Sequence, residues 1–117
     1  MKELELRFIA SGRSLWDFAV SGRAIVLNDT MTLPVNECLG KIIIVHSPSP
    51  DVILYMRHAV AVVAETGGPL CHAAVLATEI GCPIVVAVDD ITKLVSNGSR
   101  LTLISKDGVG KIYETDV

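Results

Sequence analysis

The residues best suited to chemistry in this sequence lie in one short segment, ETGGPLCHAA at positions 65–74. Gly67 and Gly68 allow the backbone to turn with positive φ and to approach a bound group closely. The residues after them look like a helix start, where unpaired N–H groups and the helix dipole attract anions. His72 falls in that first turn, and Thr66 adds a hydroxyl donor. Because a neutral imidazole can attack phosphorus without a base, the segment predicts a phosphate site with His72 as nucleophile.

Ordinary interpretations of the same segment stay open. Paired glycines before a helix are often only a tight turn, and a histidine at a helix start is often a cap or a surface residue. The segment lacks the G-x-G-x-x-G pattern of a dinucleotide site and the lysine of a P-loop. Adjacent helical residues point about 100° apart, so Cys71 and His72 do not face each other as a Cys–His nucleophile would. We therefore expect Cys71 to pack or to cap the helix.

Short apolar runs, separated by Gly, Pro, Asn and Asp, predict the strands that must position this segment. Period-two alternation indicates the first strand, and continuous β-branched runs indicate strands buried on both faces. The expected strands cover residues 4–8, 23–27, 41–45, 59–64, 83–88, 101–104 and 111–113. An Asp107-Gly108 turn, typical of a β-hairpin, joins the last two.

Capping signals predict three helices, over residues 50–58, 70–80 and 89–95. The alanine-rich second helix is the best defined, and Gly81 supplies its left-handed C-cap. Strands and helices alternate in the middle of the chain, which favours parallel pairing, whereas the flanks favour antiparallel hairpins. We therefore predict an α/β fold with a mixed sheet, arranged as two sheet layers and a helical layer.

Composition restricts the function classes. The 117 residues fit a single domain over 1–117, too short for both a nucleotide-triphosphate site and a separate acceptor site. With 10 basic and 13 acidic residues the chain lacks the basic surface of a nucleic-acid binder. It has no apolar run near the roughly 20 residues of a membrane helix. The N-terminus MKELELRF is unlike a signal peptide, so we expect a cytosolic protein.

Cysteine and histidine spacing predicts no metal site. The three cysteines form no CxxC pair, and their odd number indicates free thiols rather than a disulfide framework. The histidines show no ligand spacing with them. The residues concerned are Cys38, Cys71, Cys82, His46, His58 and His72.

The segment TGGPLCHAAVLA at 66–77, followed by Glu79, Gly81 and Pro83, resembles the motif of the mobile phosphohistidine domain of PEP-utilising enzymes. Phosphoenolpyruvate synthase, pyruvate phosphate dikinase, enzyme I of the sugar phosphotransferase system and rifampin phosphotransferase belong to that family. The similarity extends over about residues 20–114 and includes the runs IVVA and DGVGKI further along the chain.

This resemblance implies a swivelling β/β/α fold in which His72 is phosphorylated during the catalytic cycle. It implies that the phosphate-binding residues are Thr66, Gly67, Gly68 and Cys71. It also implies partners, namely an ATP-grasp nucleotide-binding subunit, a PEP- or pyruvate-binding subunit, or both. ATP or PEP and Mg²⁺ would bind to those partners, with no cofactor bound by this domain. The resulting hypothesis is a stand-alone carrier that relays a phosphoryl group in trans to an acceptor such as pyruvate.

One departure from the motif supports a different hypothesis. The family usually has arginine after the alanine at position 77, where this chain has Thr78. A guanidinium can hold phosphate through two parallel hydrogen bonds and a threonine cannot. Arg57 and Arg100 are candidate substitutes. If neither serves, the chain is a degenerate, non-catalytic copy that acts as an anion-binding, partner-binding or regulatory subunit.

The remaining polar candidates have simpler explanations. His46 follows a buried strand and is expected to be a structural histidine, although it could line the same face as the glycines. His58 ends a short helix, where a cation interacts favourably with the dipole. Asp89 and Asp90 are expected to cap a helix rather than to bind a metal. Trp16 and Phe18 are expected to pack on the core.

Overall fold

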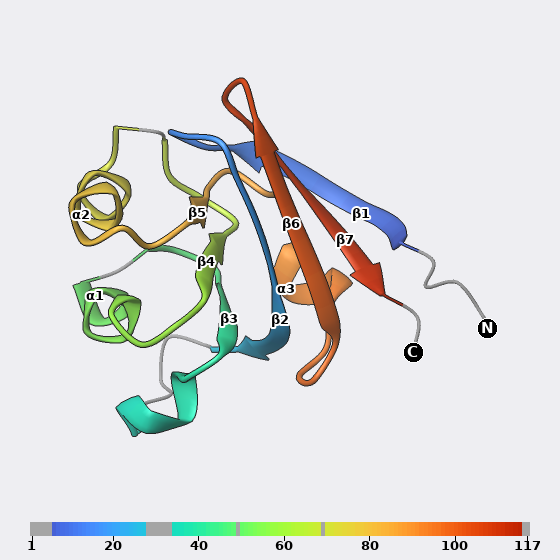
Figure 1. Ribbon diagram of the computed structural model, residues 1–117, viewed down its shortest axis with the longest axis horizontal. Coiled ribbons are helices and arrows are strands. Elements are labelled where there is room, and N and C mark those ends of the chain that lie inside the picture. The colour runs from blue at the N-terminus through green and yellow to red at the C-terminus, as the bar shows by residue number, and fades with distance from the viewer. Residues whose placement is uncertain (1–5, 28–33, 49, 69, 116–117) are drawn as a thin grey trace.

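The strands form one seven-stranded mixed sheet in the order β1-β7-β6-β2-β3-β4-β5 (Figure 1). The computed structural model describes residues 6–27, 34–48, 50–68 and 70–115. The strands are β1 (Leu6–Arg13), β2 (Phe18–Val26), β3 (Lys41–Val45), β4 (Ala61–Ala64), β5 (Ile84–Val85), β6 (Arg100–Lys106) and β7 (Val109–Thr115). The helices are α1 (Pro50–Met56), α2 (His72–Ile80), α3 (Ile91–Leu94) and the short 3-10 helix η1 (Val35–Cys38). No helix in these ranges is long and apolar enough to cross a membrane.

The parallel half of the sheet consists of β2, β3, β4 and β5. Its inner strands are almost entirely buried, as the runs KIIIV and AVVA predict. Ile43 pairs with Val62, and Val62 pairs with Ile84. Helix α1 connects β3 to β4, and helix α2 connects β4 to β5. The carboxyl ends of these strands therefore meet at one edge of the sheet, where the segment after β4 begins.

The antiparallel half consists of β6, β7 and β1, joined to the parallel half by the β2–β6 pair. Asp107 and Gly108 both have positive φ, 54° and 83°, so they form the type I′ turn that the sequence predicts between β6 and β7. Strand β1 pairs with β7 rather than with β2. Its last residue, Arg13, forms an antiparallel bridge with Val86, which follows β5. This bridge brings the two outer edges of the sheet together.

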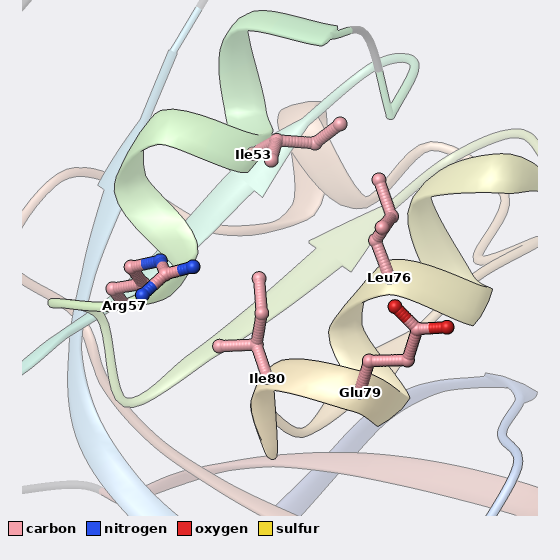
Figure 2. Close-up of a pocket in the computed structure, with 5 residues that line it drawn as sticks. All are labelled: Ile53, Arg57, Leu76, Glu79 and Ile80. Atoms are coloured by element: carbon pink, nitrogen blue, oxygen red, sulfur yellow. The ribbon is translucent and has the colours of Figure 1, made fainter.

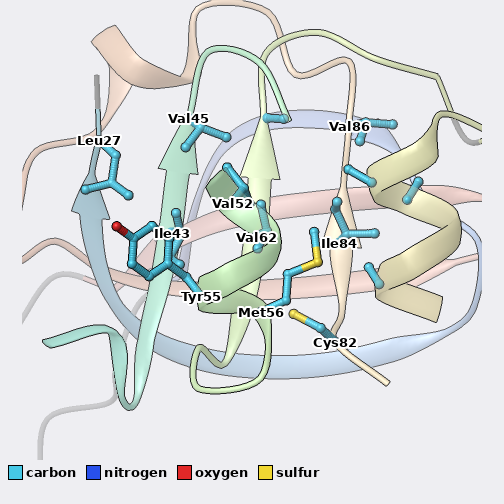
Figure 3. Packing of buried hydrophobic residues seen from close by; sticks show 14 of the residues in the cluster. Leu27, Ile43, Val45, Val52, Tyr55, Met56, Val62, Cys82, Ile84 and Val86 are labelled. Atoms are coloured by element: carbon cyan, nitrogen blue, oxygen red, sulfur yellow. The ribbon is translucent and has the colours of Figure 1, made fainter. Parts of the chain in front are cut away.

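Two hydrophobic cores separate three layers. One core packs α1 and α2 against the helix-facing side of β3, β4 and β5, with Met56, Ala74 and Val62 among its members (Figure 3). The other lies between the parallel strands and the antiparallel strands, where Ile44, Leu103 and Ile91 are buried. Figure 1 shows α1 and α2 on one side of β3 and β4, with β6, β7, β1 and α3 on the other. The chain is therefore an α/β protein with one mixed sheet, whose parallel half and antiparallel half form two layers beside the layer of α1 and α2, which confirms the predicted class.

Most predicted element boundaries are corrected. Strands β1, β2, β6 and β7 are longer than the expected runs 4–8, 23–27, 101–104 and 111–113, whereas β4 and α3 are shorter than the expected 59–64 and 89–95. Strand β5 is only two residues long, because Ala87 has a φ of 60° and cannot continue a strand. Helix α2 begins at His72 rather than at position 70, and Leu70 before it is exposed. Helix α1 ends at Met56, so His58 lies just beyond it. The sequence signals did not predict η1, and positions 4 and 5 of the first expected strand lie outside the described residues.

Candidate functional site

The glycine loop, which we define as residues 66–71, connects the end of β4 to the start of α2. Glu65, just before the loop, and Thr66, its first residue, extend the pairing of β3 and β4. The N–H of Glu65 donates to the carbonyl of Val45 (3.1 Å), and the N–H of Thr66 donates to that of His46 (3.0 Å). The loop therefore leaves the sheet from a fixed backbone position at the carboxyl edge.

Gly67 is the residue at which the loop turns. Its φ is 103°, a region that side chains rarely adopt, and a Cβ there would lie 3.2 Å from Cγ of Pro48. Gly68 has open space around it and does not have positive φ. The expectation that both glycines turn with positive φ is thus correct for Gly67 and wrong for Gly68. A small residue at Gly68 still leaves its backbone open to an approaching group.

His72 is the first residue of α2, and its side chain is exposed to solvent. Among the described residues, no hydrogen bond or ion pair engages its imidazole. Cys71 occupies the N-cap position, with its N–H bonded to the carbonyl of Gly68 (3.0 Å), but its thiol does not cap the helix. The Cys71 side chain therefore leaves the first-turn N–H groups of α2 uncapped. An anion-binding helix start requires such uncapped N–H groups. Cys71 is half-buried and packs against the helix-side core, as expected.

The Thr66 hydroxyl, expected to donate to a bound phosphate, is bonded to other groups in this structure. Its Oγ1 donates to the carbonyl of His46 (3.2 Å) and lies 3.1 Å from the hydroxyl of Ser47. The side chain thus fastens the loop to the end of β3. To hold a phosphoryl group on His72, the hydroxyl would have to rotate away from His46.

The two arginines considered as substitutes for the motif arginine do not lie at the start of α2. Arg100 begins β6 and pairs with Arg23, which in turn pairs with the first residue of β3. Arg100 therefore lies where the parallel strands begin, whereas the glycine loop lies where they end. Arg57 lies beside the C-terminal half of α2 (Figure 2). Thr78 itself donates its hydroxyl to the carbonyl of Ala74 (3.0 Å), four residues back in the same helix. Position 78 therefore presents no phosphate partner.

A groove of about 640 Å³ separates α1 from α2 and is lined by Ile53, Arg57, Leu76, Glu79 and Ile80. Figure 2 shows Ile53 and Leu76 facing each other across it, with Arg57 at the end of α1. None of the predicted site residues lines this groove. Its nearest approach to the site is Leu76, one helical turn beyond His72.

A buried carboxylate at the base of the loop was not predicted to have a role. One oxygen of Glu65 lies 2.6 Å from Nδ1 of His46, and the other accepts hydrogen bonds from the N–H (2.9 Å) and hydroxyl of Thr92 in α3. The Glu65 side chain is only 11% exposed. Burial by itself raises the pKa of Glu65, but the hydrogen bonds from Thr92 and His46 outweigh it and lower this pKa below its usual value. An acid directly after the apolar run AVVA was the available signal, since a buried carboxylate needs partners.

The other polar candidates have structural positions. His46 is held by Glu65, in agreement with the structural interpretation. Asp90 is the N-cap residue of α3, as expected, but it has a φ of 60° and its side chain makes no capping hydrogen bond. Trp16 and Phe18 form an edge-to-face pair, and Phe18 packs against the core between the sheets. The described residues contain no cluster of three or more potential metal ligands.

The three cysteines should differ sharply in reactivity in the folded protein. Cys38 and Cys82 are buried. Burial raises the pKa of the Cys82 thiol to about 11, and it also raises the pKa of the Cys38 thiol. Because the thiolate is the reactive form, we expect a disulfide reagent such as DTNB to modify one thiol quickly, Cys71, and the others only after unfolding in guanidinium. The count of fast-reacting thiols measures this. Cys71→Ser should remove the fast phase, and two or more fast thiols in the native protein would contradict the burial.

Comparison with known proteins places this site in a family. The family model "PEP-utilising enzyme, mobile domain" matches residues 39–108, which include β3 to β6 and the whole glycine loop. The chain is 31% identical over 106 residues to a phosphoenolpyruvate synthase of Neisseria meningitidis and 32% identical over 107 residues to one of Synechocystis. Each alignment covers 90% of this chain but 13% of the relative, so the chain spans about an eighth of those relatives.

A solved structure supports the fold. The solution structure of Enzyme I (nEIt) superposes with a TM-score of 0.56 at 18% identity, covering 68% of this chain and 34% of that one. Its identity is too low to support more than the architecture, and it agrees with the mixed sheet and few helices seen here. The matched family model covers well over half of the residues, including the complete T-G-G-x-x-C-H run. The chain belongs to the mobile-domain family of PEP-utilising enzymes.

Proposed function

We propose that this protein is a phosphohistidine carrier, in which His72 accepts a phosphoryl group from ATP or PEP and passes it to an acceptor such as pyruvate. The observation that supports this most is the position of His72 at the first residue of α2, directly after the glycine loop. Its imidazole is exposed and makes no hydrogen bond or ion pair with the described residues. A ring nitrogen of neutral His72 attacks phosphorus and forms an N–P bond. The bond from phosphorus to the leaving oxygen breaks, and that oxygen departs with the nucleotide or the pyruvate enolate. In the second transfer an oxygen of the acceptor attacks the phosphorus, the N–P bond breaks, and His72 is released as neutral imidazole.

The loop supplies charge stabilisation in this proposal. In it, backbone N–H groups near Gly67, Gly68 and the first turn of α2 bind a phosphoryl group on His72, and the positive end of the helix dipole favours its charge. Cys71 fixes the first turn, and Thr66 adds a donor after rotating its hydroxyl. Phosphoryl transfer depends mainly on positioning and charge stabilisation, which a small rigid loop can provide.

The nucleotide and acceptor sites lie on other domains or polypeptides in this proposal. The chain spans about an eighth of phosphoenolpyruvate synthases that it resembles, which leaves room there for both sites and for Mg²⁺. A cytosolic location is part of the proposal.

Labelling tests this function directly. The protein is incubated with Mg²⁺, ³²P-labelled ATP or PEP, and a phosphoenolpyruvate synthase from which its own mobile domain has been deleted. We expect label on this protein that is lost in acid and retained in alkali, and that is removed when pyruvate is added. Label that survives acid would assign the phosphate to a hydroxyl side chain rather than to histidine.

The position of Thr78 favours a second function, a degenerate copy that binds an anion or a partner without transferring phosphate. Its hydroxyl is bonded back to Ala74, and neither Arg57 nor Arg100 lies at the start of α2. If this function is correct, the wild type takes up no label, whereas Thr78→Arg restores labelling because a guanidinium can clamp phosphate. Under the carrier proposal, Thr78→Arg instead raises an existing rate, by about tenfold for one charge-assisted contact. Thr78→Lys, which lacks the forked geometry, is the matched control.

A further inference from the structure

The base of the glycine loop is fastened by more contacts than a surface turn requires. Glu65, which precedes the loop, reaches two other elements through its carboxylate. One oxygen meets Nδ1 of His46 at the end of β3, and the other accepts two hydrogen bonds from Thr92 in α3. We call Glu65, His46 and Thr92 the loop clamp. It joins residues separated by 19 and 27 positions in the sequence.

The clamp acts on the face of the sheet opposite to α2. Val62 and Ala64 of β4 face α1 and α2, whereas Ala61 and Val63 face the antiparallel half of the sheet. Alternation along the strand therefore places the Glu65 side chain on the side of the antiparallel half and the Thr66 side chain on the side of α1 and α2. Thr66 is bonded there to His46 and Ser47. The two residues before Gly67 are thus held from both faces, so the turn at Gly67 starts from a fixed direction.

We propose that Glu65 is a positioning residue for phosphoryl transfer, and that through Thr92 and His46 it holds the glycine loop in the geometry that His72 needs. This inference rests on the carrier function proposed above and deepens it. Glu65 does not touch the phosphoryl group, since its carboxylate faces away from α2 and its negative charge would repel the anion. Its effect passes through the backbone of residues 65–66 to Gly67 and the start of α2. Misplacing reacting groups by about 1 Å can cost a transfer reaction about a hundredfold in rate.

Three substitutions separate positioning from general stability. Glu65→Ala removes all the clamp contacts, whereas Glu65→Gln keeps an oxygen that can accept from Thr92. Thr92→Val removes a single hydroxyl and preserves shape, so it remains informative even if Glu65→Ala fails to fold. Glu79→Gln is the matched control, because Glu79 is an exposed glutamate in α2 for which the structure shows no side-chain hydrogen bond or ion pair within the described chain.

Two measurements are made on each variant. The first is hydrogen exchange of the Thr66 and Cys71 amides, which are hydrogen-bonded at the two ends of the loop. The second is the initial rate of ³²P labelling at saturating donor, in the assay described above. For Thr92→Val we expect loop exchange to rise and labelling to slow, each by about tenfold for one lost bond to a charged group. Glu65→Ala should change both the loop exchange rate and the labelling rate by more than Thr92→Val does. Glu65→Gln should give values between those of Glu65→Ala and the wild type. Glu79→Gln should match the wild type, and the exchange of the β3 amides should be unchanged in every variant.

The outcomes separate this inference from the proposed function. If loop exchange rises in Glu65→Ala or Thr92→Val but the labelling rate does not change, the positioning role is overturned and the carrier function is left intact. Equal acceleration of loop and β3 amides would show a merely structural role and would also overturn it. Loop exchange that stays at the wild-type value in Thr92→Val excludes the clamp without any donor being needed. Failure of the wild type itself to accept label refutes the carrier function and, with it, the transfer role of Glu65.

Discussion

Replacing His72 with alanine is expected to abolish the acid-labile phosphate that the carrier function predicts, lowering labelling by about a thousandfold or more because the nucleophile is gone. The nearby nucleophiles are engaged elsewhere in part: Nδ1 of His46 is bonded to Glu65, and Cys71 is half-buried against the helix-side core. Phosphate release in acid, measured on the purified protein after labelling, gives the readout.

The matched control for this experiment is His58→Ala. His58 is also an exposed histidine beside a helix, but it follows α1 and lies outside the glycine loop. Its loss should leave labelling at the wild-type rate. The His72 side chain is exposed and makes no hydrogen bond or ion pair within the part of the chain that the structure describes, so its removal should barely change the melting temperature. Label that persists in His72→Ala and disappears in another histidine variant would reassign the phosphorylated residue.

Local sequence signals were sufficient for the elements on which this site depends. The run KIIIV is strand β3 to the residue, and Asp107-Gly108 is the type I′ turn of the last hairpin. Gly81 has a φ of 85° and ends α2 as expected. These features follow from side-chain periodicity and from backbone conformations that few residues adopt, both of which act within a few positions along the chain.

Long-range contacts could not be predicted in the same way. The pairing of β1 with β7 joins residues about a hundred positions apart, and no local pattern specifies that partner. The loop clamp likewise depends on where α3 places Thr92 relative to Glu65. The early end of β5 arises from the positive φ of Ala87, a conformation that alanine disfavours and that only the surrounding packing imposes. The local elements that carry the candidate site were therefore predictable, whereas the long-range contacts that hold them in place were not.

The largest effect on stability is expected from Gly12→Ala in β1. A Cβ at Gly12 would lie 2.3 Å from the carbonyl oxygen of Val86 and 2.5 Å from Cγ2 of Val88. Val86 is bridged to Arg13, so its backbone cannot retreat without breaking the contact between the sheet edges. Overpacking of this kind should cost about 3 kcal/mol of unfolding free energy. A melting temperature lower by about 10 °C or more, measured by circular dichroism, would follow.

A second glycine shows whether backbone or side chain sets this cost. The three atoms nearest to a Cβ at Gly110 of β7 all belong to the side chain of Val85, whose two methyl carbons would lie 2.6 Å and 2.8 Å away. Gly110→Ala should therefore also destabilise, but Val85→Ala should partly rescue it, with a favourable coupling of about 1 kcal/mol or more. The same Val85→Ala change should not rescue Gly12→Ala, because the Val86 carbonyl stays in place. Gly68→Ala, with nothing within 4 Å of the added carbon and no positive φ, is the control and should be close to neutral in stability. Rescue of both variants by Val85→Ala would contradict this argument. It would mean that the Val86 carbonyl moves away from a Cβ at Gly12, and that side-chain crowding alone sets the cost at both glycines.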